Sequence, residues 1–314
     1  MYNRMRYLRI SLLKACNFNC FYCRPPSIND YRPGDFTDPD KFKHSLSLLL
    51  RLGVEKVRFT GGEPTLYKYL PDLIAHTKNI NSRVTTALTT NGRMLMRLAP
   101  KLARAGLDSV NISLDTISKS KFARITTVDC FEKVVGGINI AKENFRDVKL
   151  NCVVIKGVND DEIGEMVDFA QMLNVDIRFI EYMRTKYSAS QDRGYLPMKE
   201  TIKLINHKLY PVTTDIASPA RYFSADDLTI NSGFINSVSQ PFCNFCNRIR
   251  LTSDGNLHTC LFSSRSLNLF DLLDRDSEIA AKEINRFVAG KVYAGSSPVS
   301  SPGEHLPSFS EIGG

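Results

Sequence analysis

Six of the eight cysteines in this chain form two groups of three that lie far apart in the sequence. The first trio, spaced C-x3-C-x2-C, is Cys16, Cys20 and Cys23, and the second, spaced C-x2-C-x13-C, is Cys243, Cys246 and Cys260. Each trio is one thiolate short of a closed four-cysteine site. Structural metal sites are normally closed, whereas a missing ligand leaves a position for a substrate or cofactor. The spacing therefore predicts two metal clusters that both take part in chemistry.

The composition is that of an ordinary globular protein. Apolar residues make up 43% and charged residues 24% of 314 residues, which allows one large domain or one domain with a smaller appendage. No apolar stretch approaches the length of a membrane span, and the first residues lead into an apolar strand without a signal-peptide core. We therefore expect a cytoplasmic protein with no membrane partner. In that compartment thiols stay reduced, and cysteine groups are more typical of metal sites than of disulfides.

The net charge of +8 leaves the kind of ligand open. A solvated basic surface would explain it, and so would an anionic ligand such as a nucleoside triphosphate. Nucleic acid is the least favoured partner, because the basic residues are dispersed and form neither Lys/Arg tracts nor a known nucleic-acid module.

The hydrophobic pattern alternates between strands and helices about six times. The strands are expected at residues 6–13, 57–60, 84–90, 109–114, 148–155 and 175–180, and Asp38-Pro39 opens the first helix as cap and first helical residue. The crossover lengths suit parallel pairing. Six units are too few for a closed eightfold barrel, so the sequence predicts an α/β fold with a partial (β/α)6 TIM-like barrel. An open doubly wound sheet is the alternative.

The pattern changes after Met183. A polar loop is followed by a helix expected at 199–210 and by short strands around the second cysteine trio, so we place a domain boundary near residue 215. This gives a barrel over 1–214 and a smaller cluster domain over 215–314. The polar residues singled out below are expected after the C-terminal ends of strands, where parallel barrels place their active sites.

The first trio has two possible occupants on spacing alone. Three thiolates on one loop can hold three irons of a [4Fe–4S] cube with the fourth iron open, or a zinc ion with a distant fourth ligand. The spacing after a first strand, with Tyr22 before Cys23 and with Gly61-Gly62-Glu63-Pro64 after the second strand, resembles the radical S-adenosylmethionine (SAM) superfamily. The resemblance implies that the open iron chelates SAM and that one electron cleaves it to a 5′-deoxyadenosyl radical.

The second trio by itself is typical of half a zinc ribbon, with His258 as a possible fourth ligand. Its surroundings, residues 237–243, 246–252, 254–257 and 260–262, closely resemble the radical-SAM GTP 3′,8-cyclase family of molybdenum cofactor biosynthesis. The similarity covers nearly the whole chain. It includes residues 8–11, 58–64, 89–92, 111–115, 156–160, 178–183 and the final 313–314.

This resemblance implies a second [4Fe–4S] cluster with an open iron at which the guanine of GTP binds, with His258 as a neighbour and not a ligand. The adenosyl radical would abstract the ribose C3′ hydrogen, and the product would be 3′,8-cyclo-7,8-dihydro-GTP. A cyclic pyranopterin monophosphate synthase would act next. The sequence indicates neither the electron donor nor the oligomeric state, and a homodimer is one of the alternatives.

Position by position, the resemblance assigns three sets of residues. SAM would be contacted by Tyr22, Gly62, Ser113 and Met183; GTP by Arg9, Arg58, Thr89, Lys156, Arg248, Ile249 and Arg250; and the catalytic tail would be Gly313 and Gly314. Three features depart from the family: Arg24 replaces a usual methionine, the loop after Met183 lacks a glycine–tryptophan pattern, and the Ser/Pro-rich segment before the diglycine is less basic. The rival interpretations are a peptide-maturing two-cluster radical-SAM enzyme and a non-catalytic zinc protein that binds nucleic acid.

Overall fold

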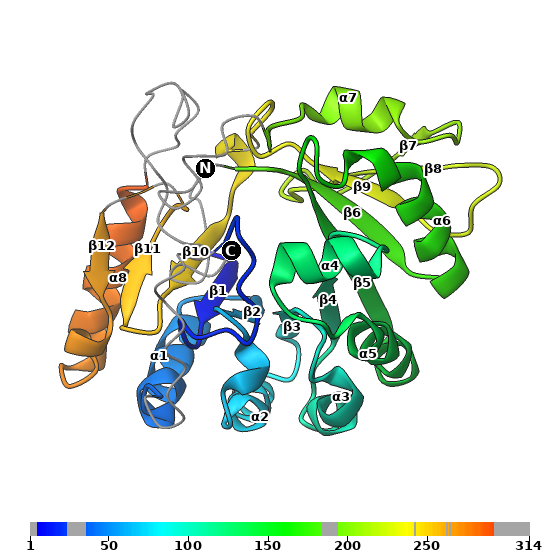
Figure 1. Ribbon diagram of the computed structural model, residues 1–314. Coiled ribbons are helices and arrows are strands. Elements are labelled where there is room, and N and C mark those ends of the chain that lie inside the picture. Colours follow the sequence, from blue (N-terminus) through cyan, green and yellow to red (C-terminus); the bar gives the residue numbers. More distant parts are fainter. Residues whose placement is uncertain are drawn as a thin grey trace.

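One mixed sheet of twelve strands organises the part of the chain that the computed structural model describes, residues 5–23, 36–183, 194–241, 243–261, 263 and 265–291. The strand order is β12-β11-β10-β1-β2-β3-β4-β5-β6-β9-β8-β7. Figure 1 shows this sheet curving around, with β10–β12 on one side of β1 and with β9 and β8 beyond β6. The order ends at β12 and β7, so the sheet is open.

The central strands are the six that the sequence predicts, and they pair in chain order. They are β1 (Tyr7–Ser11), β2 (Lys56–Thr60), β3 (Thr85–Thr90), β4 (Ser109–Ser113), β5 (Asp147–Val154) and β6 (Asp176–Glu181). Each pairs in parallel with the next. The α/β class and the parallel six-strand barrel segment are thereby confirmed.

Strands from the C-terminal part extend both sides of this segment. β10 (Arg248–Leu251) pairs in parallel with β1, and β9 (Ser232–Ile235) pairs in parallel with β6. The outer strands are antiparallel: β11 (Asn256–His258) and β12 (Ser266–Asn268) beyond β10, and β8 (Arg221–Ser224) and β7 (Tyr210–Val212) beyond β9. Residues after 215 thus continue the same sheet, and the domain boundary near 215 stays a prediction.

The crossover helices are α1 (Pro39–Arg51), α2 (Leu70–Ile80), α3 (Leu95–Arg104), α5 (Phe131–Asn144) and α6 (Ile163–Leu173). Figure 1 shows α1, α2, α3 and α5 along the outer side of the curved sheet. As predicted, Asp38 caps α1, and its carboxylate accepts a hydrogen bond from the Asp40 amide at 2.9 Å. Apolar side chains of α1 such as Phe42 and Leu46 are fully buried with strand residues such as Phe59. Burial of this kind contributes roughly 1.5–3 kcal/mol per large side chain.

Three helices differ from the sequence-based expectation. α4 (Lys119–Thr126) and α8 (Ser277–Ala289) were not predicted, and the helix expected at 199–210 is the shorter α7 (Met198–Lys203). Beyond α7, the His207 ring is held between Asp227 at 2.7 Å and Asp168 at 3.1 Å, and Tyr210 already begins β7. These tertiary contacts end the helix where local periodicity would continue it. Among the described residues, no helix has both the length and the apolar character that crossing a membrane requires.

Candidate functional site

The loop that carries the first cysteine trio is fastened to the turn after β2. Main-chain hydrogen bonds run from the Leu12 amide to the Thr60 carbonyl at 2.9 Å, from Gly62 to Leu13 at 2.7 Å and from Glu63 to Ala15 at 2.8 Å. These bonds extend the β1–β2 pairing into the loop, so the turn positions the cysteines.

The two glycines of this turn are required by that close approach. A Cβ on Gly62 would lie 2.1 Å from the Ala15 carbonyl oxygen, and one on Gly61 would lie 2.6 Å from the Leu13 carbonyl oxygen. Gly61 also has a φ of +141°, which side chains rarely adopt. The space beside these glycines is therefore occupied by the cysteine loop itself.

Glu63 of the same turn joins the cysteine loop to the end of β3. Its buried carboxylate accepts hydrogen bonds from the Thr65 amide at 3.0 Å, the Thr90 hydroxyl at 2.7 Å and the Asn91 amide at 2.7 Å. Burial raises the pKa of Glu63, and these donors oppose the shift. The donors satisfy the carboxylate, so the turn is rigid.

The sulfur atoms of the first trio lie among hydrogen-bond donors. The Phe18 amide is 3.4 Å and the Asn91 side-chain nitrogen 3.8 Å from the Cys16 sulfur. Burial, followed by the charges of Cys23, Asp115 and Cys16, raises the pKa of Cys20. The three cysteines are half-buried, thiols bind metal as thiolates, and donors aimed at the sulfurs suit an iron–sulfur cluster. The residues present thus fit a cluster here.

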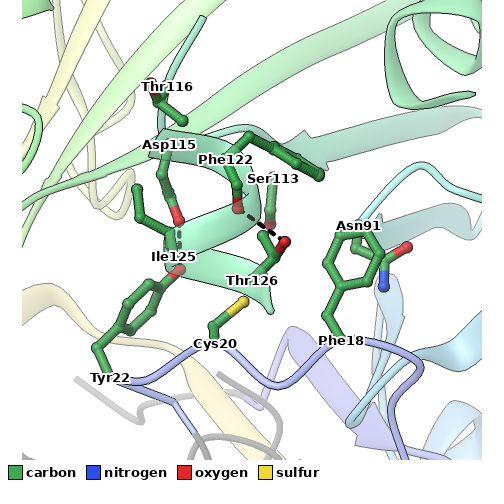
Figure 2. A pocket seen from close by; sticks show the side chains of 10 residues that line it. All are labelled: Phe18, Cys20, Tyr22, Asn91, Ser113, Asp115, Thr116, Phe122, Ile125 and Thr126. Atoms are coloured by element: carbon green, nitrogen blue, oxygen red, sulfur yellow. Dashed lines mark hydrogen bonds between the residues drawn. The ribbon is translucent and has the colours of Figure 1, made fainter. Parts of the chain in front are cut away.

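A small cavity of about 40 Å³ opens beside this loop (Figure 2). Two predicted SAM contacts, Tyr22 and Ser113, line it together with Cys20. Gly62 lies in the turn described above, and Met183 is half-buried just after β6. One wall of the cavity comes from the unpredicted helix α4, through Phe122, Ile125 and Thr126. The sequence signal for α4 was the cap Ser118, followed by these residues at helical spacing.

Tyr22 is fixed by a buried carboxylate. Its hydroxyl donates to Asp115 at 2.6 Å, as Figure 2 shows, and the other Asp115 oxygen accepts from the Val153 amide at 2.9 Å. Asn159 completes the network by donating to the Asp115 carbonyl at 2.7 Å. Burial raises the pKa of Asp115 to about 6, against the effect of its two donors, and raises the pKa of Tyr22 well above its usual value. The phenol therefore stays protonated and holds its ring against the cavity.

Three arginines stand at the same register on adjacent strands. Arg9 on β1 is paired with Arg250 on β10 and with Arg58 on β2. Because side chains alternate between the two faces of a sheet, residues at one register share a face. We call Arg250, Arg9 and Arg58 the arginine row. Arg58 is held by hydrogen bonds to the Tyr7 hydroxyl at 2.6 Å, the Leu88 carbonyl at 3.0 Å and the Thr89 hydroxyl at 3.2 Å.

A second row lies two residues earlier on the same strands and the same face. Here Tyr7 is paired with Arg248 on β10 and with Lys56 on β2. The Arg248 guanidinium lies 5.2 Å and the Lys56 ammonium 5.3 Å from the centre of the Tyr7 ring, distances typical of cation–π contacts. Of the two cations, only Arg248 was predicted as a site residue.

Arg178 on β6 was not predicted as a ligand contact. Its Nε and Nη2 atoms are buried and have no hydrogen-bond partner among the described residues, and burial lowers its pKa. A buried guanidinium without hydrogen-bond partners costs free energy unless an anion pairs with it. The available signal was an arginine within the otherwise apolar strand pattern 177–180.

Burial and mutual repulsion make the charged form of Arg9 and Arg250 less favourable than it is in water. Burial first, and then Arg250, lowers the pKa of Arg9 well below its usual value, and burial and Arg248 lower the pKa of Arg250 to about 10. A polyanion would relieve both the desolvation and the mutual repulsion, and would receive charge-assisted hydrogen bonds. The arrangement is therefore suited to a triphosphate.

The second trio lies at the opposite end of β1 from the first. Cys246 is two residues before β10 and Cys260 two residues after β11, and β11 runs antiparallel to β10. Since β10 is parallel to β1, both cysteines lie near the start of β1, whereas Cys16 follows its end. The arginine row lies between the trios. The expectation that all functional residues follow the C-terminal ends of strands is therefore wrong for the arginines, which lie within strands, and for the second trio.

Lys291 ties the second trio to β10. Its ammonium group donates to the Cys246 carbonyl at 2.8 Å, to the Cys246 sulfur at 3.5 Å and to the Arg248 carbonyl at 2.9 Å. Burial, with the nearby Cys260 and Cys246, raises the pKa of Cys243. His258 on β11 is opposite Arg250, and burial lowers its pKa. Within the described residues, no three His, Cys, Asp or Glu side chains are arranged to hold a single metal ion.

The remaining predicted residues lie apart from the arginine row or cannot be placed. Lys156 is exposed beyond the end of β5. Ile249 is buried on the opposite face of β10 from its two arginine neighbours, so only its main chain faces the row. Arg24, the loop residues 184–193 and the diglycine Gly313 and Gly314 lie outside the described residues.

Two family models match adjoining parts of the chain. The Radical SAM superfamily model matches residues 10–170, and the model described as Molybdenum Cofactor Synthesis C matches residues 175–294. The GTP 3′,8-cyclase of Marinobacter nauticus is 37% identical over 84% of this chain and 82% of its own length, and that of Clostridium botulinum is 36% identical over 92% and 91%. The chain belongs to the GTP 3′,8-cyclase family of the radical SAM superfamily. Membership of this superfamily implies SAM and one [4Fe–4S] cluster.

Longer relatives and a solved structure extend the comparison. Molybdenum cofactor biosynthesis protein 1 of Mus musculus is 39% identical over 85% of this chain, which spans only 43% of that protein. The Streptococcus suis SuiB structure bound to S-adenosylmethionine superposes with a TM-score of 0.64, at 17% identity, over 85% of this chain and 64% of that one. At that identity the superposition shows a shared fold, and it agrees with the partial barrel that GTP 3′,8-cyclase family membership implies.

Proposed function

We propose that this chain is a GTP 3′,8-cyclase, a lyase that converts GTP into 3′,8-cyclo-7,8-dihydro-GTP in molybdenum cofactor biosynthesis. The observation that carries the proposal is the arginine row between two cysteine trios. The bacterial relatives that this chain covers over most of their length bear the same activity in their names. Arg58 is buried and Arg9 and Arg250 are half-buried, and the triphosphate of GTP would supply the negative charge that this row of cations favours.

The first trio would hold the [4Fe–4S] cluster whose open iron takes SAM. When bound, that pair supplies the radical that removes a hydrogen atom from the substrate. The protein's part is to orient SAM through Tyr22, Gly62, Ser113 and Met183 and to hold it in the cavity beside α4. The Asp115 carboxylate keeps Tyr22 in one orientation.

The second trio would hold a further [4Fe–4S] cluster, beside which the guanine would lie. The arginine row and Arg248 would bind the triphosphate, with Thr89 orienting Arg58 and the main chain of Ile249 facing the substrate. Lys156 would contact GTP from beyond the end of β5. Between the trios, β1 spans roughly 15 Å from one end to the other, enough for a nucleotide.

Four further assignments complete the proposal. Gly313 and Gly314 would serve catalysis, a cyclic pyranopterin monophosphate synthase would consume the product, and two copies would form a homodimer. The domain division at 215 would separate the SAM-binding barrel from the cluster and GTP-binding part.

Anaerobic turnover tests the proposal. Reconstituted protein with about eight irons per chain is incubated with SAM, GTP and a reductant, and both 5′-deoxyadenosine and 3′,8-cyclo-7,8-dihydro-GTP are followed by mass spectrometry. We expect the two products in equal amounts. Formation of 5′-deoxyadenosine without consumption of GTP would remove the substrate assignment, and zinc with negligible iron would remove the reaction class.

A further inference from the structure

Tyr7 occupies an unusual place in the cation-rich face of the sheet. It is a half-buried phenol at the centre of the second row, with Arg248 on one side and Lys56 on the other. Both cations lie over its ring, and Arg58 of the arginine row donates its Nε hydrogen to the Tyr7 oxygen at 2.6 Å. One tyrosine side chain thus touches three of the cations.

The charged groups that act on Tyr7 come from four strands. On its own strand this is Arg9; on β2, Lys56 and Arg58; on β10, Arg248 and Arg250; and on β6, Arg178. Asp147 at the start of β5 acts on Lys56 and Arg178, and it is not among the main influences on Tyr7. Within the part of the chain that the structure describes, every strong electrostatic influence on the phenol is therefore positive.

We propose that Tyr7 is the built-in counter-ion of this site: its oxygen holds Arg58 in place before substrate binds, and it takes up a proton from solvent when the triphosphate arrives. The inference rests on the proposed function, because it assigns the anion to the triphosphate of GTP. It makes Tyr7 a positioning residue that acts through Arg58.

The electrostatics of the site agree with this role. Burial raises the pKa of Tyr7, but the charges of Arg58, Arg9, Lys56 and Arg248 together lower it to about 7. Near neutral pH the phenol is therefore partly ionised and offsets part of the repulsion among the cations. A triphosphate bound beside Tyr7 outweighs the positive charge of the arginines and raises the pKa of Tyr7. The phenolate then takes up a proton and becomes phenol. Because the bound state then carries the additional proton, affinity for the triphosphate falls as the pH rises through 7.

Calorimetric titration of the two-cluster protein with GTP tests this directly. Binding is measured anaerobically from pH 6.5 to 8.5 in buffers of different ionisation enthalpy, which gives the number of protons exchanged. For the wild-type protein we expect uptake that rises towards about one proton per site at pH 8, and a loss of affinity over this range roughly tenfold larger than in Tyr7→Phe. Release of protons by GTP itself is common to both proteins and cancels in the comparison.

Two further variants make the result specific. Tyr210→Phe removes a half-buried phenol on the edge strand β7 whose hydroxyl donates to Asp226, and it should behave as wild type. Lys56→Met tests the competing source of pH dependence, since burial also lowers the pKa of Lys56. Iron content and melting temperature check that each variant is folded and loaded. The inference is overturned if Tyr7→Phe keeps the wild-type proton uptake, or if Lys56→Met alone abolishes it.

Inorganic tripolyphosphate separates this inference from the proposed function. If tripolyphosphate binds with Tyr7-dependent proton uptake while GTP does not bind, the counter-ion role stands and GTP is not the substrate. If GTP binds with the same pH dependence in the wild type and in Tyr7→Phe, the substrate stands and the counter-ion role fails. If neither ligand binds, both fail.

Discussion

At the scale of single residues, the site depends on buried polar groups whose partners are few and specific. Asp115 accepts from Tyr22 and Val153, and Arg58 donates to Tyr7, Leu88 and Thr89. Removing one partner from such a group leaves the other with an unsatisfied charge or dipole. Substitutions that keep the shape and remove one hydrogen bond are therefore the most informative.

Tyr22→Phe keeps the ring beside the cavity and removes the donor to Asp115. Because burial raises the pKa of Asp115 to about 6, its carboxylate is mainly ionised at pH 7 and mainly neutral at pH 5. We expect the free energy of unfolding to fall by about 1–3 kcal/mol at pH 7 and by less at pH 5, where the group that loses its donor is uncharged.

Urea denaturation of the metal-free protein at the two pH values measures this difference. Tyr67→Phe is the matched control, because its buried hydroxyl donates to the neutral Thr37 carbonyl at 2.8 Å and its loss should cost the same at both pH values. An equal cost at pH 5 and pH 7 for Tyr22→Phe would contradict the argument.

Arg58→Lys keeps a positive charge in the arginine row but cannot make the three hydrogen bonds of the guanidinium. We expect affinity for GTP to fall roughly tenfold or more, equivalent to about 1.4 kcal/mol, while SAM affinity is unchanged because Arg58 does not line that cavity. Equilibrium binding of each ligand checks this. Arg83→Lys, at an exposed position before β3, should leave both affinities unaltered.

At the scale of elements, the turn after β2 and the cysteine loop form one unit. The glycines of the turn leave room for the loop, and Glu63 fastens both to the end of β3. The sequence identified this turn by its motif, and the resemblance gave Gly62 as a contact of SAM. The additional reason, contact with the loop main chain, could not be found without knowing that β1 and β2 pair side by side.

Gly62→Ala should therefore displace the first trio. The new methyl group would lie 2.1 Å from the Ala15 carbonyl oxygen, and its three nearest atoms all belong to the main chain of Lys14 and Ala15, so no flexible side chain can yield. We expect reconstituted protein to lose about four irons per chain and SAM cleavage, with the second trio still loaded. Iron analysis and electron paramagnetic resonance measure this.

Gly136→Ala in α5 is the control for that substitution. Its nearest neighbour would be the sulfur of Met96, at 2.9 Å, which belongs to an exposed and flexible side chain that can move aside. Full iron content in Gly62→Ala would show that the loop tolerates a side chain there.

At the scale of the whole molecule, prediction from sequence succeeded where the information is local. Asp38 and Pro39 open α1 as expected, and the six parallel strands follow from their buried patterns. It failed where distant segments meet. Nothing local indicates that β10 pairs with β1, yet this pairing brings Arg250 beside Arg9 and moves the second trio to the far end of the barrel. The spacing of the cysteines identified both trios in the sequence. The alignment of the arginines on neighbouring strands could be seen only from the strand pairing of the folded chain.

The separation of the two trios predicts independent loading. Cys243→Ser should leave about four irons per chain bound at the first trio and should preserve SAM cleavage, while formation of the cyclic product is lost. We expect this because the two trios lie at opposite ends of β1 and share no cysteine ligand. Cys130→Ala, at a buried cysteine outside both trios, should keep about eight irons. Loss of all iron in Cys243→Ser would show that the two sites assemble together.

The two outermost strands of the sheet constrain how copies of the molecule can associate. β12 and β7 are three residues long, and β7 carries Pro211 at its centre, which has no amide hydrogen to donate. Short or proline-bearing edge strands are poor templates for another strand, so neither end of the sheet, as far as the described residues form it, favours the addition of strands from other copies. If two copies of this protein associate, we therefore expect them to meet through surfaces other than these two strands.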